Sequence, residues 1–351
     1  MASPAPDGPH VVVHGAGSVG CWIGAAWMAS RISVSFLGRQ SVKDEIAANG
    51  LTVTDAERRR IELRPDEVDF AVHPKALARA DIIILCVKSI GTQAAAKEIS
   101  RHARKSATVI SFQNGVSNVE ALKAALPGRV VLAGMVPFNV ARMGNGRWHK
   151  GVSGTLWAED HDVTHALNDR IGDRPGGMRL SDDMTGVLWG KLLINLNNAV
   201  NALSGRTLLE QLGDRDYRRV VAASQVEALE VLEAAGIAPA QIGPIPPKLV
   251  PHAIAAPDLV FRNTVLKVQK IDAAARSSMA DDFAAGRPTE IDFLNGEIVR
   301  LARSIGRAAP VNERIVELVR QAEAGVERAW PARELRDYVL ERHAGAKGFG
   351  Y

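Results

Sequence analysis

Apolar and polar positions alternate regularly over the first half of the chain. Short apolar segments with the β-branched content of strands occur at residues 11–14, 33–37, 81–87, 107–112 and 129–135. Helical patterns lie between them, through about residue 29 and over 92–103 and 118–125, and residues 51–63 predict a hairpin around a charged turn. Because buried strands alternating with helices are typical of a parallel sheet covered on both faces, this half predicts a doubly wound α/β domain.

The pattern changes beyond this sheet. Residues 147–157 are expected to form one or two edge strands. Helical periodicity then runs over residues 184–203, 217–235, 265–285, 289–304 and 312–324. We therefore expect disordered residues 1–9, a Rossmann-type dinucleotide-binding domain over 10–180, an all-helical domain over 181–327, and an extension over 328–351 with no assigned role.

Length and composition narrow the class of protein. The 351 residues are 46% hydrophobic and 23% charged, which suits two folded domains. The two cysteines, Cys21 and Cys86, give no disulfide framework, and the nine histidines are scattered, so we predict no metal site. A net charge of +4, distributed along the chain, does not indicate nucleic-acid binding. With no secretory leader and no apolar run near ~18 residues, we expect a cytoplasmic protein without a membrane partner.

A glycine-rich turn follows the first strand. The residues Gly15-x-Gly17-x-x-Gly20 enclose Ser18 and Val19 and lead directly into a helix. In this strand–turn–helix context the first glycine permits a tight turn, the second lets the backbone approach a pyrophosphate, and the third allows close helix–strand packing. The alternative is a glycine-rich turn without a ligand. We predict dinucleotide binding here, with the phosphates at the helix N-terminus.

The end of the second strand indicates which dinucleotide binds. An acidic residue at this place would bind the ribose hydroxyl of NAD, but this strand ends with Gly38 and Arg39. Arg39 lies about 20 residues beyond the glycines, and a guanidinium suits a 2′-phosphate. The sequence therefore favours NADP(H), and the alternative is an ordinary solvated arginine.

Two polar residues follow apolar strands, where the ligand crevice of such sheets lies. Lys88 comes directly after residues 82–87, and Asn114 follows residues 107–112. Either side chain can hydrogen-bond a substrate or a cofactor. A snorkelling lysine and a turn asparagine are equally good interpretations of the pattern.

A polar stripe marks one helix of the second half. Lys191, Asn195 and Asn198 lie at positions i, i+4 and i+7, and the remaining positions are mostly apolar. Asparagines are poor helix formers and need partners when buried. A partly buried lysine among amides is a candidate general acid, because burial lowers its pKa toward the working pH. The alternative is an amide network between helices with a surface lysine.

A second polar segment spans residues 276–296. We expect two helical pieces here, one capped by Ser278 with Asp281 three positions later, and the other capped by Thr289. This structural interpretation explains much of the segment. In the functional interpretation, Ser278 binds a substrate carboxylate or hydroxyl and Glu290 faces Lys191.

Taken together, these residues resemble the ketopantoate reductase (2-dehydropantoate 2-reductase) family, from Val11 to about Leu318. The Lys-x-x-x-Asn helix recurs in other 3-hydroxyacid dehydrogenases, whereas the polar segment from Ser277 to Gly296 is the most family-specific part. The resemblance rests on the glycine turn at 14–20, Arg39, Val87-Lys88, Gln113-Asn114-Gly115, Trp189-x-Lys191-x-x-x-Asn195, Ser277-Ser278-Met279-x-x-Asp282, and Gly286-Arg287-x-Thr289-Glu290-Ile291-Asp292-x-x-Asn295-Gly296.

The resemblance implies a Rossmann domain, a helical domain, and NADPH-dependent reduction of 2-dehydropantoate to (R)-pantoate, a step of pantothenate and coenzyme A biosynthesis. It implies that Lys191 is the proton donor and that Glu290 contacts the substrate hydroxyl. By the same resemblance, Asp282 is a supporting acid. The implied substrate-binding residues are Asn114, Asn195 and Ser278, and the implied cofactor-binding residues are Arg39 and Lys88.

One position departs from the family. A further substrate-binding asparagine is common in the family eight residues after the lysine, but Ala199 stands there. Asn198 lies beside it on the face of the lysine, and we expect it to bind substrate in its place. Three functions therefore remain open: ketopantoate reduction, NADP-dependent reduction of another branched 2-oxo acid, and non-catalytic NADP-binding regulation. Retention of Lys191 and Glu290 argues against the third. Analogy with the fold suggests a homodimer formed through the helical domain.

Overall fold

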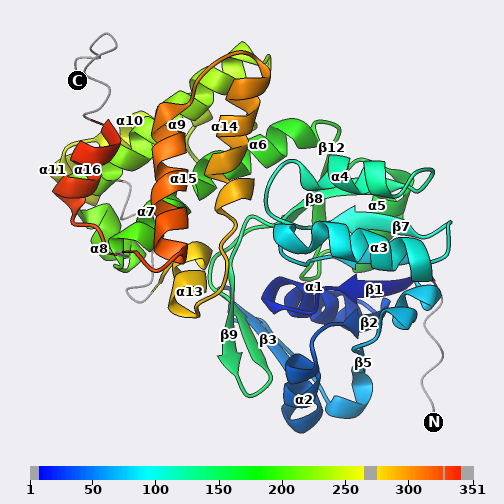
Figure 1. Ribbon diagram of the computed structural model, residues 1–351. Coiled ribbons are helices and arrows are strands. Elements are labelled where there is room, and N and C mark those ends of the chain that lie inside the picture. The colour runs from blue at the N-terminus through cyan, green and yellow to red at the C-terminus, as the bar shows by residue number, and fades with distance from the viewer. Residues whose placement is uncertain (1–7, 265–274, 327–328, 341–351) are drawn as a thin grey trace. The chain divides into compact units, whose positions relative to one another are not determined.

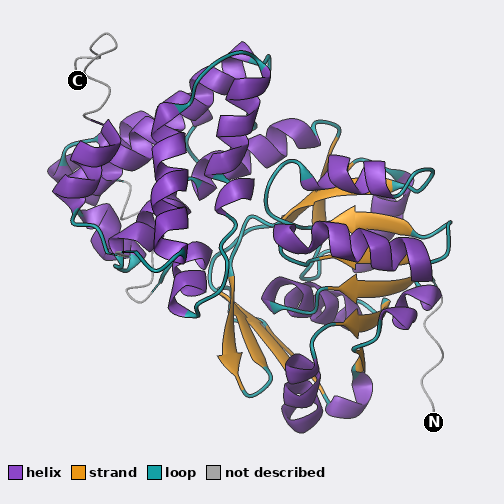
Figure 2. Cartoon of the chain, in the orientation of Figure 1, coloured by secondary structure: helices purple, strands orange, loops and turns teal. Residues whose placement is uncertain are grey.

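The computed structural model describes residues 8–264, 275–326 and 329–340 (Figure 1). Its internal contacts divide the chain into two compact units, Met1–Met184 and Thr185–Tyr351. The first unit contains both sheets, and the described part of the second is helical (Figure 2). The predicted fold class, a Rossmann-type sheet domain followed by a helical domain, is confirmed. The expectation of a disordered N-terminus falls mainly on residues 1–7, which lie outside the described residues.

An eight-stranded sheet forms the centre of the first unit, in the order β12-β11-β8-β7-β6-β1-β2-β5. Neighbouring strands are parallel except for β11 and β8. The order reverses at β1, so the carboxyl ends of β1 and β6 flank the crevice in which such sheets bind ligands. The strands are β1 (His10–His14), β2 (Ser33–Leu37), β5 (Asp69–Ala71), β6 (Ile82–Leu85), β7 (Thr108–Ser111), β8 (Val131–Met135), β11 (Leu156–Glu159) and β12 (Met178–Ser181).

Successive residues of β1 show how both faces of this sheet are covered. Val11 and Val13 pack in a core with Trp22 of helix α1, whereas Val12 packs in a second core with Ile99 of helix α3. Strand side chains alternate between faces, so α1 and α3 lie on opposite sides of the sheet. The helices of this unit are α1 (Ser18–Ala29), α2 (Gln40–Asn49), α3 (Thr92–His102), α4 (Asn118–Ala125), α5 (Asp162–Ile171) and the 3₁₀ turns η1 (Pro65–Glu67), η2 (Pro74–Arg79) and η3 (Ser89–Gly91).

A smaller sheet has the order β4-β3-β10-β9, with β3 (Leu51–Asp55), β4 (Arg60–Leu63), β9 (Val140–Gly144) and β10 (Arg147–Lys150). The predicted hairpin is confirmed, since β3 and β4 pair antiparallel. The prediction that residues 147–157 form edge strands is wrong, because β10 lies between β3 and β9 and β11 lies between β8 and β12. The reason is burial: Trp148 is 1% exposed and belongs to the same core as α1.

Helices make up the described part of the second unit. A core of α7, α9, α13, α15 and α16 residues holds it together, including Val200 and Val220. The helices are α6 (Met184–Asn195), α7 (Asn197–Ser204), α8 (Leu208–Gly213), α9 (Arg215–Ala234), α10 (Val250–Ala255), α11 (Asp258–Asn263), α13 (Ser278–Ala284), α14 (Asn295–Ser304), α15 (Pro310–Glu323), α16 (Ala332–Leu340) and the 3₁₀ turns η4 (Pro247–Leu249) and η5 (Ile291–Phe293).

Several predicted helices of this unit need correction. The single helix expected over 184–203 is divided at Leu196. The helix expected over 289–304 is a 3₁₀ turn, η5, followed by α14. The first part of the helix expected over 265–285 lies outside the described residues, and α13 begins only at Ser278. Part of the extension that received no role forms α16, whose Leu335 and Val339 belong to the core.

No helix within the described ranges is both long and apolar enough to cross a membrane.

Candidate active site

The glycine turn has the backbone geometry that a dinucleotide-binding loop requires. Gly15 has φ +100°, and a Cβ there would lie 2.5 Å from the amide nitrogen of Val87. A Cβ on Gly20 would lie 2.5 Å from the carbonyl oxygen of Gly15, so this glycine lets α1 approach the turn closely. A Cβ on Gly17 would meet no atom within 4 Å, which leaves open space beside the N-terminus of α1. The position of each glycine therefore allows the role that the fingerprint gives it, and dinucleotide binding here stays a prediction.

The amide groups of this turn are also arranged for an anion. The amides of Gly15 and Ala16 both bond the carbonyl oxygen of Leu37 at 3.0 Å, which fixes the turn to the end of β2. Helix α1 begins at Ser18, its N-cap is Gly17, and no side chain caps it in the described structure. The first amides of a helix have no intrahelical partner, so those near Ser18 and Val19 are positioned to bind phosphate.

Arg39 lies where the second strand ends and is the N-cap residue of α2. Its side chain is exposed, and the first turn of α2 contains no acidic residue. An anion placed here would meet a guanidinium and a helix N-terminus together, and the 2′-phosphate site stays a prediction.

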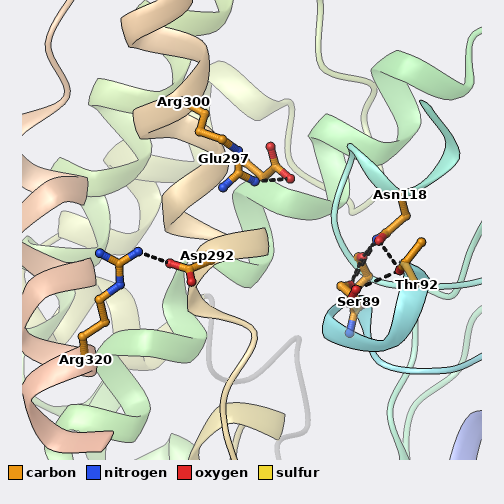
Figure 3. Close-up of polar contacts among 8 residues, drawn as sticks. Ser89, Thr92, Asn118, Asp292, Glu297, Arg300 and Arg320 are labelled. Atoms are coloured by element: carbon orange, nitrogen blue, oxygen red, sulfur yellow. Dashed lines mark hydrogen bonds and ion pairs between the residues drawn. The ribbon is translucent and has the colours of Figure 1, made fainter. Parts of the chain in front are cut away.

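A polar network that the sequence did not predict joins the ends of β6 and β7 (Figure 3). The hydroxyl of Thr92 lies 2.8 Å from Asn118 Oδ1, and Gln113 Nε2 donates to that hydroxyl at 2.8 Å. The hydroxyl of Ser89 donates to the carbonyl oxygen of Asn114 at 2.7 Å. This network fixes the two loops that carry Lys88 and Asn114. Several Ser, Thr, Asn and Gln residues follow both strands, and this cluster of polar residues is the signal that could have predicted the network.

Lys191 occupies α6 and is partly buried. Burial lowers the pKa of its ammonium group from 10.5 to about 8, and no carboxylate contributes to this shift. The expectation that Glu290 faces Lys191 stays a prediction. Asn195 lies one turn further along α6 and is 7% exposed, whereas the half-buried Asn198 belongs to α7. The predicted polar stripe therefore spans two helices.

Gly190 allows the close packing of α6 beside Lys191. A Cβ on Gly190 would lie 2.2 Å from the carbonyl oxygen of Ala240, and the amide of Ala240 donates to the carbonyl oxygen of Gly186 at 2.8 Å. The backbone at Ala240 therefore runs directly against α6, and any larger residue at 190 would displace the helix.

Ser277, not Ser278, caps α13, so the predicted cap is wrong by one residue. The hydroxyl of Ser277 accepts from the amide of Ala280 at 3.2 Å and donates to the carbonyl oxygen of Asn198 at 3.0 Å. The amide of Ser277 donates to Asn201 Oδ1 at 2.9 Å, which ties α13 to α7. Ser278 is exposed at the first position of the helix, and its ligand-binding role stays a prediction.

Asp282 supports the turn that precedes Glu290. Its Oδ1 accepts from Arg287 Nε at 3.1 Å, and its carbonyl oxygen accepts from the Arg287 amide at 2.9 Å. The turn passes through Gly286, which has φ +63°. Asp282 is 4% exposed and this pair ties it to Arg287, whereas its role as a supporting acid stays a prediction.

Glu290 lies between two connections to α15. The amide of Thr289 donates to Glu323 Oε1 at 2.7 Å, and Arg320 pairs with Asp292 at 2.7 Å (Figure 3). Thr289 does not cap α14, since its hydroxyl accepts from the Ile291 amide at the start of η5. These contacts hold Glu290, which is 8% exposed, in a fixed backbone position.

The predicted site residues fall into two sets, one on each unit. The first unit carries the glycine turn, Arg39, Lys88 and Asn114, and the second carries the lysine, amide, serine and carboxylate residues. No group of three or more His, Cys, Asp and Glu side chains gathers as a metal site among the residues that the structure describes.

Comparisons with known proteins agree with this geometry. The family described as "Ketopantoate reductase PanE/ApbA" matches residues 11–162, and its C-terminal counterpart matches residues 183–323. A 2-dehydropantoate 2-reductase of Halobacterium salinarum is 29% identical over 327 residues, covering 89% of this chain and 98% of that protein. One from Mycobacterium tuberculosis H37Rv is 28% identical over 278 residues, covering 76% of this chain and 88% of that protein.

Solved structures show the same fold. A PanE/ApbA family ketopantoate reductase from Ralstonia eutropha JMP134 has a TM-score of 0.76 at 28% identity, covering 90% of this chain and 99% of that chain. D-mandelate dehydrogenase with NADH and anilino(oxo)acetate has a TM-score of 0.74 at 19% identity, with the same coverage. The second likeness concerns the fold alone.

Proposed function

Because the chain belongs to the ketopantoate reductase family of oxidoreductases, we propose that it reduces 2-dehydropantoate to (R)-pantoate with NADPH. The observation that carries this proposal is the partial burial of Lys191 on α6, one turn before the buried Asn195. This burial lowers the pKa of the ammonium group to about 8. A lysine with this pKa is still mostly protonated at pH 7 and gives up its proton far more readily than an exposed one.

The residues of the first unit fit a dinucleotide. The open space at Gly17 and the uncapped N-terminus of α1 suit a pyrophosphate, and Arg39 suits a 2′-phosphate. When bound, NADPH supplies the hydride that reduces the C2 ketone. Lys88 and Asn114 lie at the strand ends beside this position and would hydrogen-bond the cofactor or the substrate.

The residues of the second unit supply binding and the proton. As the ketone is reduced its oxygen gains negative charge, and the ammonium group of Lys191 stabilises this charge and then protonates the oxygen. Asn195 and Asn198 would hydrogen-bond the substrate, and Ser278 would bind its carboxylate. Glu290, fixed by its neighbours against α15, would accept a hydrogen bond from the substrate hydroxyl.

A second candidate function is reduction of another branched 2-oxo acid. Ala199 is fully buried in the helical core, so residue 199 offers no polar group to a ligand. The half-buried Asn198 is the neighbouring amide that would bind in its place. A pocket with this changed amide would favour a substrate whose polar groups differ from those of 2-dehydropantoate.

Oxidation of NADPH by the purified protein with a panel of 2-oxo acids tests these functions, with NADH in parallel and Lys191→Met as the control variant. We expect the highest kcat/KM with 2-dehydropantoate and NADPH. A higher value with another branched acid selects the second candidate. Tight NADPH binding without turnover of any acid would leave a non-catalytic regulator and refute both.

A further inference from the structure

The junction of α6 and α7 departs from regular helix. The α-helical bonds of α6 end with the bond from the Leu196 amide to the Leu192 carbonyl oxygen, at 3.0 Å, and α7 begins at Asn197. The last carbonyl groups of a helix need partners from outside it. The next carbonyl oxygen in the series, that of Leu193, accepts from Nε2 of Gln225 on α9 at 3.0 Å. The buried side chain of Gln225 therefore supplies, at this junction, the hydrogen bond that the helix backbone does not.

Gln225 lies in a part of α9 that is hydrogen-bonded to the start of α15. The hydroxyl of Ser224 donates to Asn312 Oδ1 at 2.9 Å. The carboxylate of Glu227 accepts from the amides of Val311 and Asn312 at 2.8 and 2.9 Å. The two amide bonds of Glu227 fix α9 to the start of α15 beside Gln225, which is itself 2% exposed. The glutamine amide is thus held in place independently of α6.

The bond to Leu193 acts on the turn that carries the proton donor. Leu193 lies between Lys191 and Asn195 on α6. A second outside contact of this helix is the bond from the Ala240 amide to the Gly186 carbonyl oxygen, near the helix start. Gln225 therefore fixes the end of α6 and Ala240 its beginning.

We propose that Gln225 is a positioning residue that fixes the last turn of α6 through the Leu193 carbonyl and so determines where the Lys191 ammonium group lies. It does not touch the substrate. Without the amide, the carbonyl would bond the following backbone instead, and α6 would continue through Leu196 with its side chains rotated. The kinetic part of the test rests on the proposed function, whereas the titration below does not.

Two variants remove the amide donor, and one neighbouring variant serves as a control. Gln225→Met keeps the length of the side chain, and Gln225→Glu keeps its shape but loses the donor when ionised. Ser224→Ala removes an equally buried hydrogen bond of α9 that does not involve α6. Circular dichroism selects the folded variants.

The first readout is the titration of Lys191 by NMR of 13C-lysine-labelled protein, with the signal assigned from Lys191→Met. The wild-type midpoint should lie near pH 8, and both Gln225 variants should move it by about half a unit or more. Ser224→Ala should lower stability and leave the midpoint unchanged. A midpoint that stays at the wild-type value in folded Gln225→Met overturns the proposal, as does an equal change in Ser224→Ala.

The second readout separates positioning from general loosening. Displacing the donor should lower kcat about tenfold or more, because small displacements of reacting groups are costly, while KM for NADPH stays unchanged. Ser224→Ala should retain kcat. If the wild-type protein reduces no 2-oxo acid, the proposed function fails, and the titration alone still decides on Gln225.

Discussion

Replacing Lys191 by methionine should abolish activity and at the same time stabilise the protein. Methionine has nearly the length of lysine without the charge, so it removes the ammonium group and keeps most of the packing. Because the pKa of Lys191 is lowered from 10.5 to about 8, the charged form of this side chain destabilises the folded protein. At about 1.4 kcal/mol for each unit of pKa, this corresponds to roughly 3 kcal/mol.

The sign of the pH dependence follows from the direction of this shift. Between pH 8 and pH 10.5 the unfolded chain binds a proton at Lys191 that the folded protein does not, so stability rises with pH in this window. Below pH 8 the ammonium group is charged in both states, so the full free energy of burying its charge lowers the stability of the folded protein. The unfolding free energy of the variant should therefore exceed that of the wild type by about 1–3 kcal/mol near pH 7. The lower end of this range allows for the partial exposure of the Lys191 side chain. The excess should vanish near pH 10.5.

Urea unfolding followed by circular dichroism at the two pH values measures this difference. Other groups titrate equally in both proteins and cancel. A variant that is less stable at both pH values, or whose excess stability does not change with pH, would show that the Lys191 ammonium group is well hydrated. Retained turnover of 2-oxo acids in the same variant would remove Lys191 from the proposed mechanism.

Three further substitutions test other parts of the structure. Arg39→Ala should reduce the preference for NADPH over NADH in kcat/KM by about tenfold, and an unchanged ratio excludes a 2′-phosphate contact. Gly20→Ala should weaken NADPH binding in calorimetry, because its Cβ would lie 2.5 Å from the Gly15 carbonyl oxygen; unaltered affinity would show that the turn adapts. Arg218→Met should lower the unfolding free energy by about 3–5 kcal/mol in urea, since the fully buried guanidinium bonds three backbone carbonyls, and a loss below about 1 kcal/mol contradicts this.

The sheet of the first unit is predictable because its central strands are continuous apolar runs. The predicted segments 33–37 and 118–125 coincide with β2 and α4. Strands β9 and β12 were missed for a physical reason. β9 buries none of its residues fully and β12 buries only Met178, so neither carries the period-two apolar pattern on which strand prediction depends.

The residues of the candidate site likewise divide into those that the local sequence predicts and those that it does not. The glycine turn and Lys191 could be proposed from the sequence because their chemistry demands particular residue types at fixed spacing. The cap of α13 was misplaced because Ser277 and Ser278 are adjacent and either can cap, so only the start of the helix decides. Gln225 had no local signal, since its contact with Leu193 spans 32 residues.

Features that weaken a helix are concentrated where the proposed chemistry lies. Around Leu196 the chain combines a partly buried lysine, the buried Asn195 and a break in the backbone hydrogen bonds. Sequences usually avoid such combinations, and proteins retain them mainly at functional sites. The bond from Gln225 and the close contact at Gly190 offset this local weakness from outside α6. Part of what stabilises α6 therefore lies in α9 and in the backbone at Ala240. Substitutions at these places should change the pKa of Lys191 although they do not contact its side chain.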